Sequence, residues 1–441
     1  MRSTAVQKAL GLVLGVAFTI AASAPRLASA QESGVAETQT KAKASPTSPD
    51  ASLAFGQALR RAGREGEALS ELRRGLAVSG GRGEIAGRLQ WEVARTYVGR
   101  REFEPAIAAC RAMAKMPLAS GADVASHVCA AEAHLLWRRG TEAMSEVAEV
   151  AKAKAPSSEV QYFTKLASGR ALELASKDVE AEAAYREAIA VTESRPDAHV
   201  LLGTLLRRTR RDGLPSLKKA VELDVHDAVA QLELGRSLPG GSAESITAME
   251  RAVAERPTFT EALRSLAESY LVARRLPEAK KTVDAVLKLA PNDVASHVVA
   301  GRLALAEDRF DDAIKQGETA SNLMPNDEPA RLLVADAWAK KGEIDLAVEA
   351  YQAAFWLDHS DPRPLVNASE ACLAAGRVTS AKAFGVRATK DFATHAAAWT
   401  ALGDALAADR DVPGAKAAYE TAKKSRGVDA AAIDRKISKL K

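Results

Sequence analysis

Residues 396–429 read AAAWTALGDALAADRDVPGAKAAYETAKKSRGVD. The apolar positions of its first half follow the spacing i, i+3, i+4 and i+7, and they are Trp399, Leu402, Gly403 and Leu406. This spacing places them in one stripe along a helix. A short polar break at 409–413 follows, and a second helical pattern then carries Ala415 and Tyr419. The stretch therefore predicts two helices joined by a tight turn.

The same unit recurs along the chain. A small residue in its second helix returns every 34 positions, at Ser245, Ala279, Ala313, Ala347, Ala381 and Ala415. The equivalent upstream positions are less evenly spaced and are Ala68, Ala106, Ala143, Ala181 and, in a weaker copy, Gly213. A period of about 20–50 residues indicates one supersecondary unit stacked on copies of itself. We therefore expect about eleven helix-turn-helix units.

The small residues have a steric cause, because a side chain larger than a methyl group would separate two closely crossing helices. A second small position lies one turn into the first helix and includes Gly56, Gly169, Gly235 and Gly403. The second helix carries a larger side chain, for example Leu72, Tyr185, Met249 or Tyr419. This alternation of small and large residues predicts tight packing within each pair.

The pattern W-x2-LG…A…Y…A in 396–429 resembles the tetratricopeptide repeat, whose period is 34. The unit boundaries Pro291-Asn292-Asp293 and Pro325-Asn326-Asp327 also resemble that family, with proline ending one helix and aspartate capping the next. The resemblance implies an all-α fold, a right-handed superhelical solenoid of about eleven repeats with a C-terminal capping helix. It also implies a groove that binds partner proteins and no catalytic activity.

The spacing of the repeats suggests a division of the chain. The turn residues Leu238-Pro239-Gly240-Gly241 cut one first helix short, and we interpret this region as a seam between an irregular and a regular array. One continuous superhelix with two degenerate copies is the alternative. The expected segments are an export signal (1–30), a flexible linker (31–50), an irregular array (51–195), shortened repeats (196–257), a regular array (258–428) and a capping helix (429–441).

The N-terminus has the features of a cleaved export signal. Basic residues precede an uncharged stretch, and Ala28-Ser29-Ala30 forms an A-x-A site that predicts cleavage after Ala30. Cleavage would lower the net charge from +4 to +1, because the segment holds Arg2, Lys8 and Arg26 and no acidic residue. The near-neutral balance gives no reason to expect a nucleic-acid partner. We expect a periplasmic or otherwise extracytoplasmic bacterial protein without a transmembrane segment after cleavage.

Three cysteines are an odd number for an oxidising compartment. We interpret Cys110, Cys129 and Cys372 as buried small hydrophobic residues. A disulfide between Cys110 and Cys129, on neighbouring helices, is the alternative.

The sequence offers no candidate for catalysis. It contains no metalloprotease, nucleophile-elbow, phosphate-loop or dinucleotide motif, and its seven histidines are scattered over separate repeats. We therefore expect no enzyme activity, no cofactor and no metal ion.

The candidate binding residues form one column on the first helices. The residue after the small Gly or Ala is charged in most units: Arg95, Glu132, Arg170, Arg236, Glu268, Arg302, Asp336, Glu370 and Asp404. One interpretation is a ladder of ion pairs between repeats, each worth about 0–1 kcal/mol. The other is a polar groove for an extended peptide or a helix, in which the acidic end Asp336, Glu370 and Asp404 would prefer a basic segment.

Basic pairs also recur near the turn between the two helices, and Arg207, Arg208, Arg210 and Arg211 are the densest group. Cations at a helix C-terminus complement the helix dipole. Along one edge they would also form a basic rim. The expected function is a protein-interaction scaffold of the cell envelope, with binding of an envelope polysaccharide or another anionic polymer by the rim as the alternative.

Overall fold

The computed structural model describes residues 25–62, 64–116, 122–152, 158–425 and 429–440, and these residues form helices joined by short turns. The helices up to the shortened repeats are α2 (Pro25–Ala44), α3 (Pro49–Arg61), α4 (Glu65–Ser79), α5 (Gly83–Gly99), α6 (Phe103–Ala114), α7 (Ala122–Leu136), α8 (Gly140–Ala151), α9 (Ser158–Leu174), α10 (Asp178–Val191), α11 (Pro196–Arg208), α12 (Leu214–Leu223), α13 (Ala228–Ser237) and α14 (Ala243–Glu255). Those that follow are α15 (Thr260–Val272), α16 (Leu276–Leu289), α17 (Val294–Ala306), α18 (Phe310–Leu323), α19 (Glu328–Lys341), α20 (Ile344–Leu357), α21 (Arg363–Ala374), α22 (Val378–Asp391), α23 (Ala396–Ala408), α24 (Val412–Lys423) and α25 (Ala430–Ser438).

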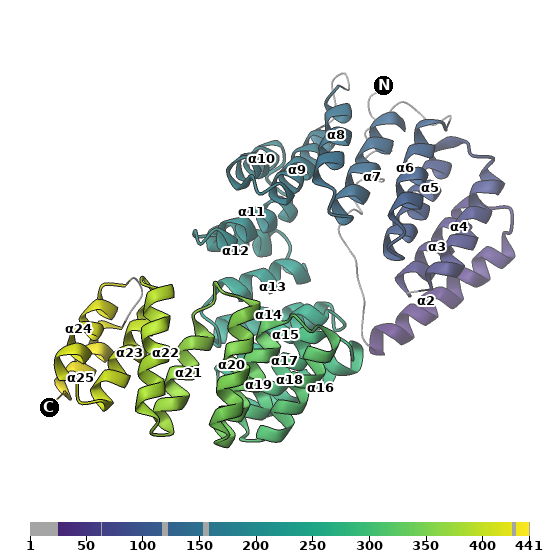
Figure 1. Ribbon diagram of the computed structural model, residues 1–441. Coiled ribbons are helices and arrows are strands. Elements are labelled where there is room, and N and C mark those ends of the chain that lie inside the picture. The colour runs from purple at the N-terminus through teal and green to yellow at the C-terminus, as the bar shows by residue number, and fades with distance from the viewer. Residues whose placement is uncertain (1–24, 63, 117–121, 153–157, 426–428, 441) are drawn as a thin grey trace. The chain divides into compact units, whose positions relative to one another are not determined.

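Helices α3 to α24 form the eleven pairs that the period predicts, so the fold is an all-α helical repeat solenoid (Figure 1). The small residue of each second helix is buried against its neighbours. Ten of these positions have no exposed surface: Ala68, Ala106, Ala143, Ala181, Ser245, Ala279, Ala313, Ala347, Ala381 and Ala415. The repeat frame read from the sequence is therefore confirmed.

The small residue of the first helix makes room for the large residue of the second. A Cβ atom added to Gly403 would lie 2.5 Å from the ring of Tyr419, and one added to Gly169 would lie 2.3 Å from the ring of Tyr185. The same holds for Gly56 against Leu72, at 2.5 Å. Since real Cβ atoms do not approach so closely, these positions require glycine for steric reasons.

From α5 onward, the turn inside each pair contains a left-handed residue after the first helix. Arg274 has φ 58°, and the backbone N–H of the next residue, Arg275, bonds back to the carbonyl of Tyr270. This geometry satisfies carbonyls that the helix end leaves free. In the repeats with the 34-residue period, Gly342 and Gly376 occupy the same position.

The chain divides into two compact units, the first ending at Ser265 and the second running from Leu266 to Lys441. This boundary falls within α15. A seam was expected at Pro239–Gly241. This break follows the end of α13 at Ser237 and therefore lies before the boundary between the two units. As predicted, the region holds short helices, because α12 and α13 have 10 residues each.

The N-terminal segment differs from expectation. Residues 31–50 were predicted to be a flexible linker, but α2 extends to Ala44 and α3 begins at Pro49. Val35 and Ala42 are both 4% exposed, and Val35 packs with Leu59 and Ala68 of the first pair. Composition did not predict this helix. A few small apolar residues at helical spacing are enough to stabilise a helix when a surface for it to pack on is already present. Most of the predicted export signal, residues 1–24, lies outside the described residues.

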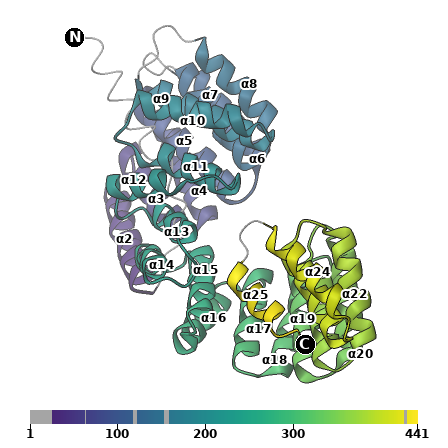
Figure 2. The same cartoon turned by 90° about the vertical axis from the view of Figure 1, so that its left-hand side faces the viewer.

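The C-terminal end of the stack is covered by the last helix. Helix α25 packs beside α24 and buries Ile433 with Tyr419, as expected of a capping helix (Figure 2).

Cys110 on α6 and Cys129 on α7 form a disulfide, so the interpretation as free buried thiols was wrong for this pair. Cys372 is free and buried.

Candidate functional site

The first part of the charged column is organised around a buried carboxylate, Glu92 on α5, which is 4% exposed. Its Oε1 accepts a hydrogen bond from Nε2 of Gln57 at 3.1 Å, and its Oε2 accepts one from Nε of Arg60 at 3.0 Å. Arg95 lies 3.5 Å from the same carboxylate. Arg95 therefore pairs within its own helix, and the α3 side chains connect the first two repeats.

Glu132 on α7 lies between arginines of the neighbouring first helices. Desolvation raises the pKa of its carboxyl to about 7, while the positive charges of Arg170 and Arg95 act in the opposite direction. The side chain is half-buried and lines a cavity with Phe163 and Arg170. For the predicted ladder Arg95–Glu132–Arg170, the structure shows the electrostatic effect of the two arginines on the Glu132 carboxyl.

Arg236 on α13 has several partners. Its Nη1 lies 3.0 Å from Glu233 and 2.8 Å from Glu261, and its Nε and Nη2 donate to the Ser265 hydroxyl. Glu233 also accepts a bond from Nη2 of Arg207 at 2.7 Å. Arg236 is therefore held in place by one repeat and the start of the next.

The second unit carries the end of the column that was predicted to be acidic. Arg302 lies 3.6 Å from Glu268, the one predicted inter-repeat pair that forms a direct contact in the described part of this unit. Asp336 accepts hydrogen bonds from the Tyr351 hydroxyl at 2.7 Å and from Nδ2 of Asn367 at 3.0 Å. Desolvation raises the pKa of Asp336, and these two bonds oppose that shift.

Asp404 repeats the arrangement one pair before the C-terminal helix. It accepts a bond from the Tyr419 hydroxyl at 2.7 Å, and both of its oxygens bind Nζ of Lys436 on α25, at 2.7 and 2.6 Å. Glu370 stands between Asp336 and Asp404 in the column and is exposed. Desolvation and the charge of Asp404 raise its pKa, with a smaller contribution from Asp336, while Lys436 lowers it.

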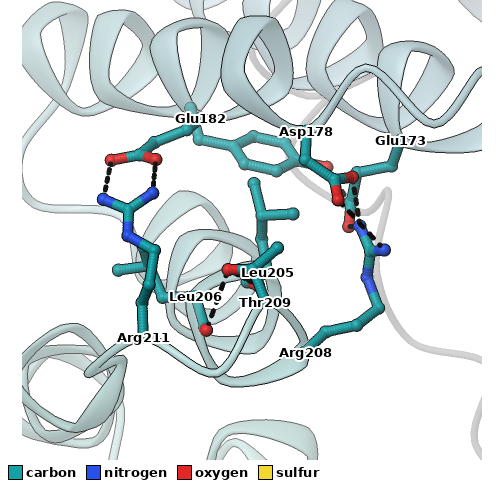
Figure 3. A network of polar contacts seen from close by, with 9 residues as sticks. Glu173, Asp178, Glu182, Leu205, Leu206, Arg208, Thr209 and Arg211 are labelled. Atoms are coloured by element: carbon teal, nitrogen blue, oxygen red, sulfur yellow. Dashed lines mark hydrogen bonds and ion pairs between the residues drawn. The ribbon is translucent and has the colours of Figure 1, made fainter.

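The basic rim is largely neutralised by neighbouring carboxylates (Figure 3). Arg208 lies 2.7 Å from Asp178 and 3.1 Å from Glu173, and Arg211 pairs with Glu182. Arg207 is paired with Glu233, as described above. Within the described chain, Arg210 has no ion pair. The four arginines therefore do not form a free basic patch.

Several residues of this surface were not predicted. Glu92 and Glu233 are three residues before a column arginine, a helical spacing that brings them to the same face. The tyrosines had been assigned to packing alone, although Asp336 and Tyr351 are 15 residues apart, as are Asp404 and Tyr419. That repeated spacing was the available signal. Lys436 carried no comparable signal, because its contact depends on how α25 docks.

The described residues contain no cluster of histidine, cysteine, aspartate and glutamate that could hold a metal ion. None of the helices in that part of the chain combines the length and apolar character needed to cross a membrane. The chemistry available on the column is hydrogen bonding and ion pairing.

Solved structures with similar folds include yeast Tom70 (13% identity, 93% of this chain and 92% of that chain, TM-score 0.48). They also include a thermophilic repeat protein of Thermus thermophilus (23% identity, 41% and 98%, TM-score 0.38) and a repeat protein of Parabacteroides merdae (14% identity, 63% and 98%, TM-score 0.43). At these scores the likenesses carry no functional implication.

No curated protein sequence matches the chain. Two family models do match it, over residues 243–299 and 295–356, and each is described as a tetratricopeptide repeat. The matched segments cover α14 to α19 and most of α20, where the 34-residue period is strict. Together with the eleven helix pairs, these matches show that the chain is a tetratricopeptide repeat protein.

Proposed function

We propose that this protein is a non-catalytic scaffold of the cell envelope that binds a basic segment of a partner protein at Asp336, Glu370 and Asp404. Tetratricopeptide repeats form protein-interaction surfaces in general. The contact between Lys436 and Asp404 is the observation that supports binding of a basic segment. It shows that a carboxylate of this column can hold a lysine that is presented by a short helix.

The electrostatics of Glu370 support the same partner chemistry. Desolvation raises its pKa most, and the carboxylates of Asp404 and, to a smaller extent, Asp336 raise it further, so additional negative charge at this place is unfavourable. A lysine or arginine of a partner would relieve that repulsion and pair with an exposed carboxylate. In the described chain Glu370 has no direct ion pair, which leaves it accessible to a partner.

Two observations support the envelope location. The disulfide between Cys110 and Cys129 fits an oxidising compartment, where such bonds persist. The N-terminal sequence up to Ala30 has the order of a cleaved export signal. N-terminal sequencing of the protein purified from cell fractions tests the location, and a start at Gln31 in an extracytoplasmic fraction is the expected result.

The groove is tested by crosslinking in intact cells followed by mass spectrometry of the captured proteins. The variant Asp336→Asn, Glu370→Gln, Asp404→Asn keeps the shapes of the side chains and removes their charge. We expect it to lose the partner that the wild-type protein captures.

A matched control neutralises three exposed carboxylates on the second helices of the same unit, Glu318→Gln, Glu349→Gln and Glu420→Gln. It should capture the partner as the wild type does. Equal capture by both variants, with unchanged circular dichroism, would show that the acidic end of the column is not the binding site.

A further inference from the structure

Five arginines occupy the left-handed position of the turn within a repeat, with φ between 58° and 63°. They are Arg101, Arg138, Arg210, Arg274 and Arg410. A left-handed conformation costs a residue with a Cβ roughly 1–2 kcal/mol, and glycine avoids that cost. Gly241, Gly342 and Gly376 fill the position in other repeats. Arginine therefore stands at a place where the backbone favours glycine.

These arginines differ from the basic residues next to them. All five are exposed, and within the described chain none of them has an ion pair or a side-chain hydrogen bond. Arg139, directly after Arg138, lies 3.7 Å from Glu142, and Arg211, directly after Arg210, pairs with Glu182. In these five turns, the arginine in the left-handed position is thus a cation without an acidic partner in the described chain.

In the first unit, one of these arginines borders a hollow of about 420 Å³. Its lining includes Arg138 and Ser176, and Ser176 is the left-handed residue of the next turn. Three leucines, Leu135, Leu174 and Leu201, supply the aliphatic part of the lining. A volume of this size holds a side chain of a bound segment.

The charge around the hollow favours an anion. Arg170 and Arg208 complete its lining on the basic side, and Glu173 is its one acidic member. Glu173 is already engaged, because it accepts bonds from the Tyr185 hydroxyl and from Arg208. An incoming carboxylate therefore meets Arg138 with its charge uncompensated.

We propose that the turn edge of the first unit, defined by Arg101, Arg138 and Arg210, binds an acidic segment of a partner protein. Carboxylates of the segment pair with the three guanidinium groups, which match carboxylate geometry. An aliphatic side chain between them enters the hollow beside Arg138. This inference rests on the proposed scaffold function and adds a second surface, on a different unit, with the opposite charge preference.

The test measures the fluorescence anisotropy of a short fluorescein-labelled peptide of repeated Glu-Glu-Leu, titrated at low ionic strength with the full-length protein. The variant Arg101→Gly, Arg138→Gly, Arg210→Gly removes the charges and relaxes the backbone, so it remains folded. We expect its affinity to fall at least about tenfold. A peptide of repeated Lys-Lys-Leu should not bind this edge.

The control variant Arg274→Gly, Arg410→Gly makes the same change at the same turn position of the second unit. It should bind the acidic peptide within about twofold of the wild type. Equal affinity of the triple variant and the wild type, or no binding by the wild type, overturns the proposal. Tighter, arginine-dependent binding of polygalacturonate than of the peptide also overturns it, in favour of an acidic polysaccharide. Capture of a basic segment at Asp336, Glu370 and Asp404 involves the second unit. A failure of that proposal can therefore be distinguished from a failure of acidic-peptide binding by the first unit.

Discussion

Nζ of Lys436 lies within 2.7 Å of both carboxylate oxygens of Asp404 and so connects the last helix of the chain to the charged column. Asn367 reaches Asp336 in the same way from the first helix of the following repeat. Helix α25 therefore acts as the first helix of a further, incomplete repeat. It covers the end of the stack with the chemistry that the interior repeats use among themselves.

Replacing Lys436 with alanine should lower the free energy of unfolding by up to about 1 kcal/mol, because the pair is partly exposed and its Coulomb energy is screened. Urea denaturation of the variant measures the change. Lys439→Ala, an exposed lysine one position beyond the same helix, is the control and should leave the midpoint unchanged. A loss equal in both variants would show that the Asp404 contact contributes nothing specific.

Gly403→Ala should destabilise the protein by about 1–3 kcal/mol, because the new methyl group would lie 2.5 Å from the Tyr419 ring. The displaced ring would also weaken the bond from its hydroxyl to Asp404. Gly66→Ala in α4 meets no atom within 4 Å and should be neutral or stabilising by up to about 1 kcal/mol. Thermal unfolding by circular dichroism compares the two, and similar shifts would contradict the steric reason given for the small residues.

Arg274→Gly should stabilise the protein by about 1 kcal/mol, since glycine adopts φ 58° without the Cβ penalty. Arg275→Gly, one residue further on, should have the opposite effect. That residue has φ −88° and lies 2.8 Å from Glu278. Differential scanning calorimetry of both variants measures the two signs, and a loss of stability in Arg274→Gly would mean that its side chain has a structural partner.

The helix pairs were predictable from the sequence because their cause is local and repeated. Ala347 and its equivalents recur at one period, and each must be small for the same steric reason. The residues that lie side by side on the first helices could also be named. Their partners could not, because a side chain in the column has several neighbours within reach. Arg95, for example, lies 3.5 Å from Glu92 of its own helix, and its charge also acts on Glu132 of the next repeat.

The basic rim shows why composition was a poor guide to the surface. Arg208 and Arg211 look like free cations in the sequence, yet acidic residues 29 to 35 positions upstream, one repeat back, neutralise them. The backbone decides which arginine stays free. Arg210 lies in the left-handed turn and has no ion pair in the described chain, and no sequence pattern marks that position.

Reduction of the disulfide between Cys110 and Cys129 should destabilise the protein by about 2–5 kcal/mol, because the bond joins residues 19 positions apart and restricts the unfolded chain. The measurement is the urea midpoint with and without reductant. In the Cys110→Ser, Cys129→Ser variant the midpoint should be low in both conditions and unaffected by the reductant. A wild-type midpoint that ignores the reductant would show that the bond does not stabilise the fold.

Glu328, which is 8% exposed at the start of α19, makes the stability of the second unit depend on pH. Burial raises the pKa of its carboxyl from 4.5 to about 7, an effect that Arg363 opposes and Asp361 and Asp358 reinforce. The folded state therefore holds this proton more tightly than the unfolded chain. Its stabilising contribution is full below about pH 4.5 and is lost as the pH rises through about 7.

Glu328→Gln mimics the protonated form at every pH. Relative to the wild type it should gain about 1–3 kcal/mol in free energy of unfolding between about pH 5 and about pH 8. Urea denaturation at both values measures the gain. Asp345→Asn removes an exposed carboxylate whose pKa is lowered from 3.8 by Arg377, and it is the control. That carboxylate is ionised in the folded and the unfolded chain at both pH values, so the difference between this variant and the wild type should not change with pH. If the difference between Glu328→Gln and the wild type is constant with pH, Glu328 is charged in the folded protein at both values.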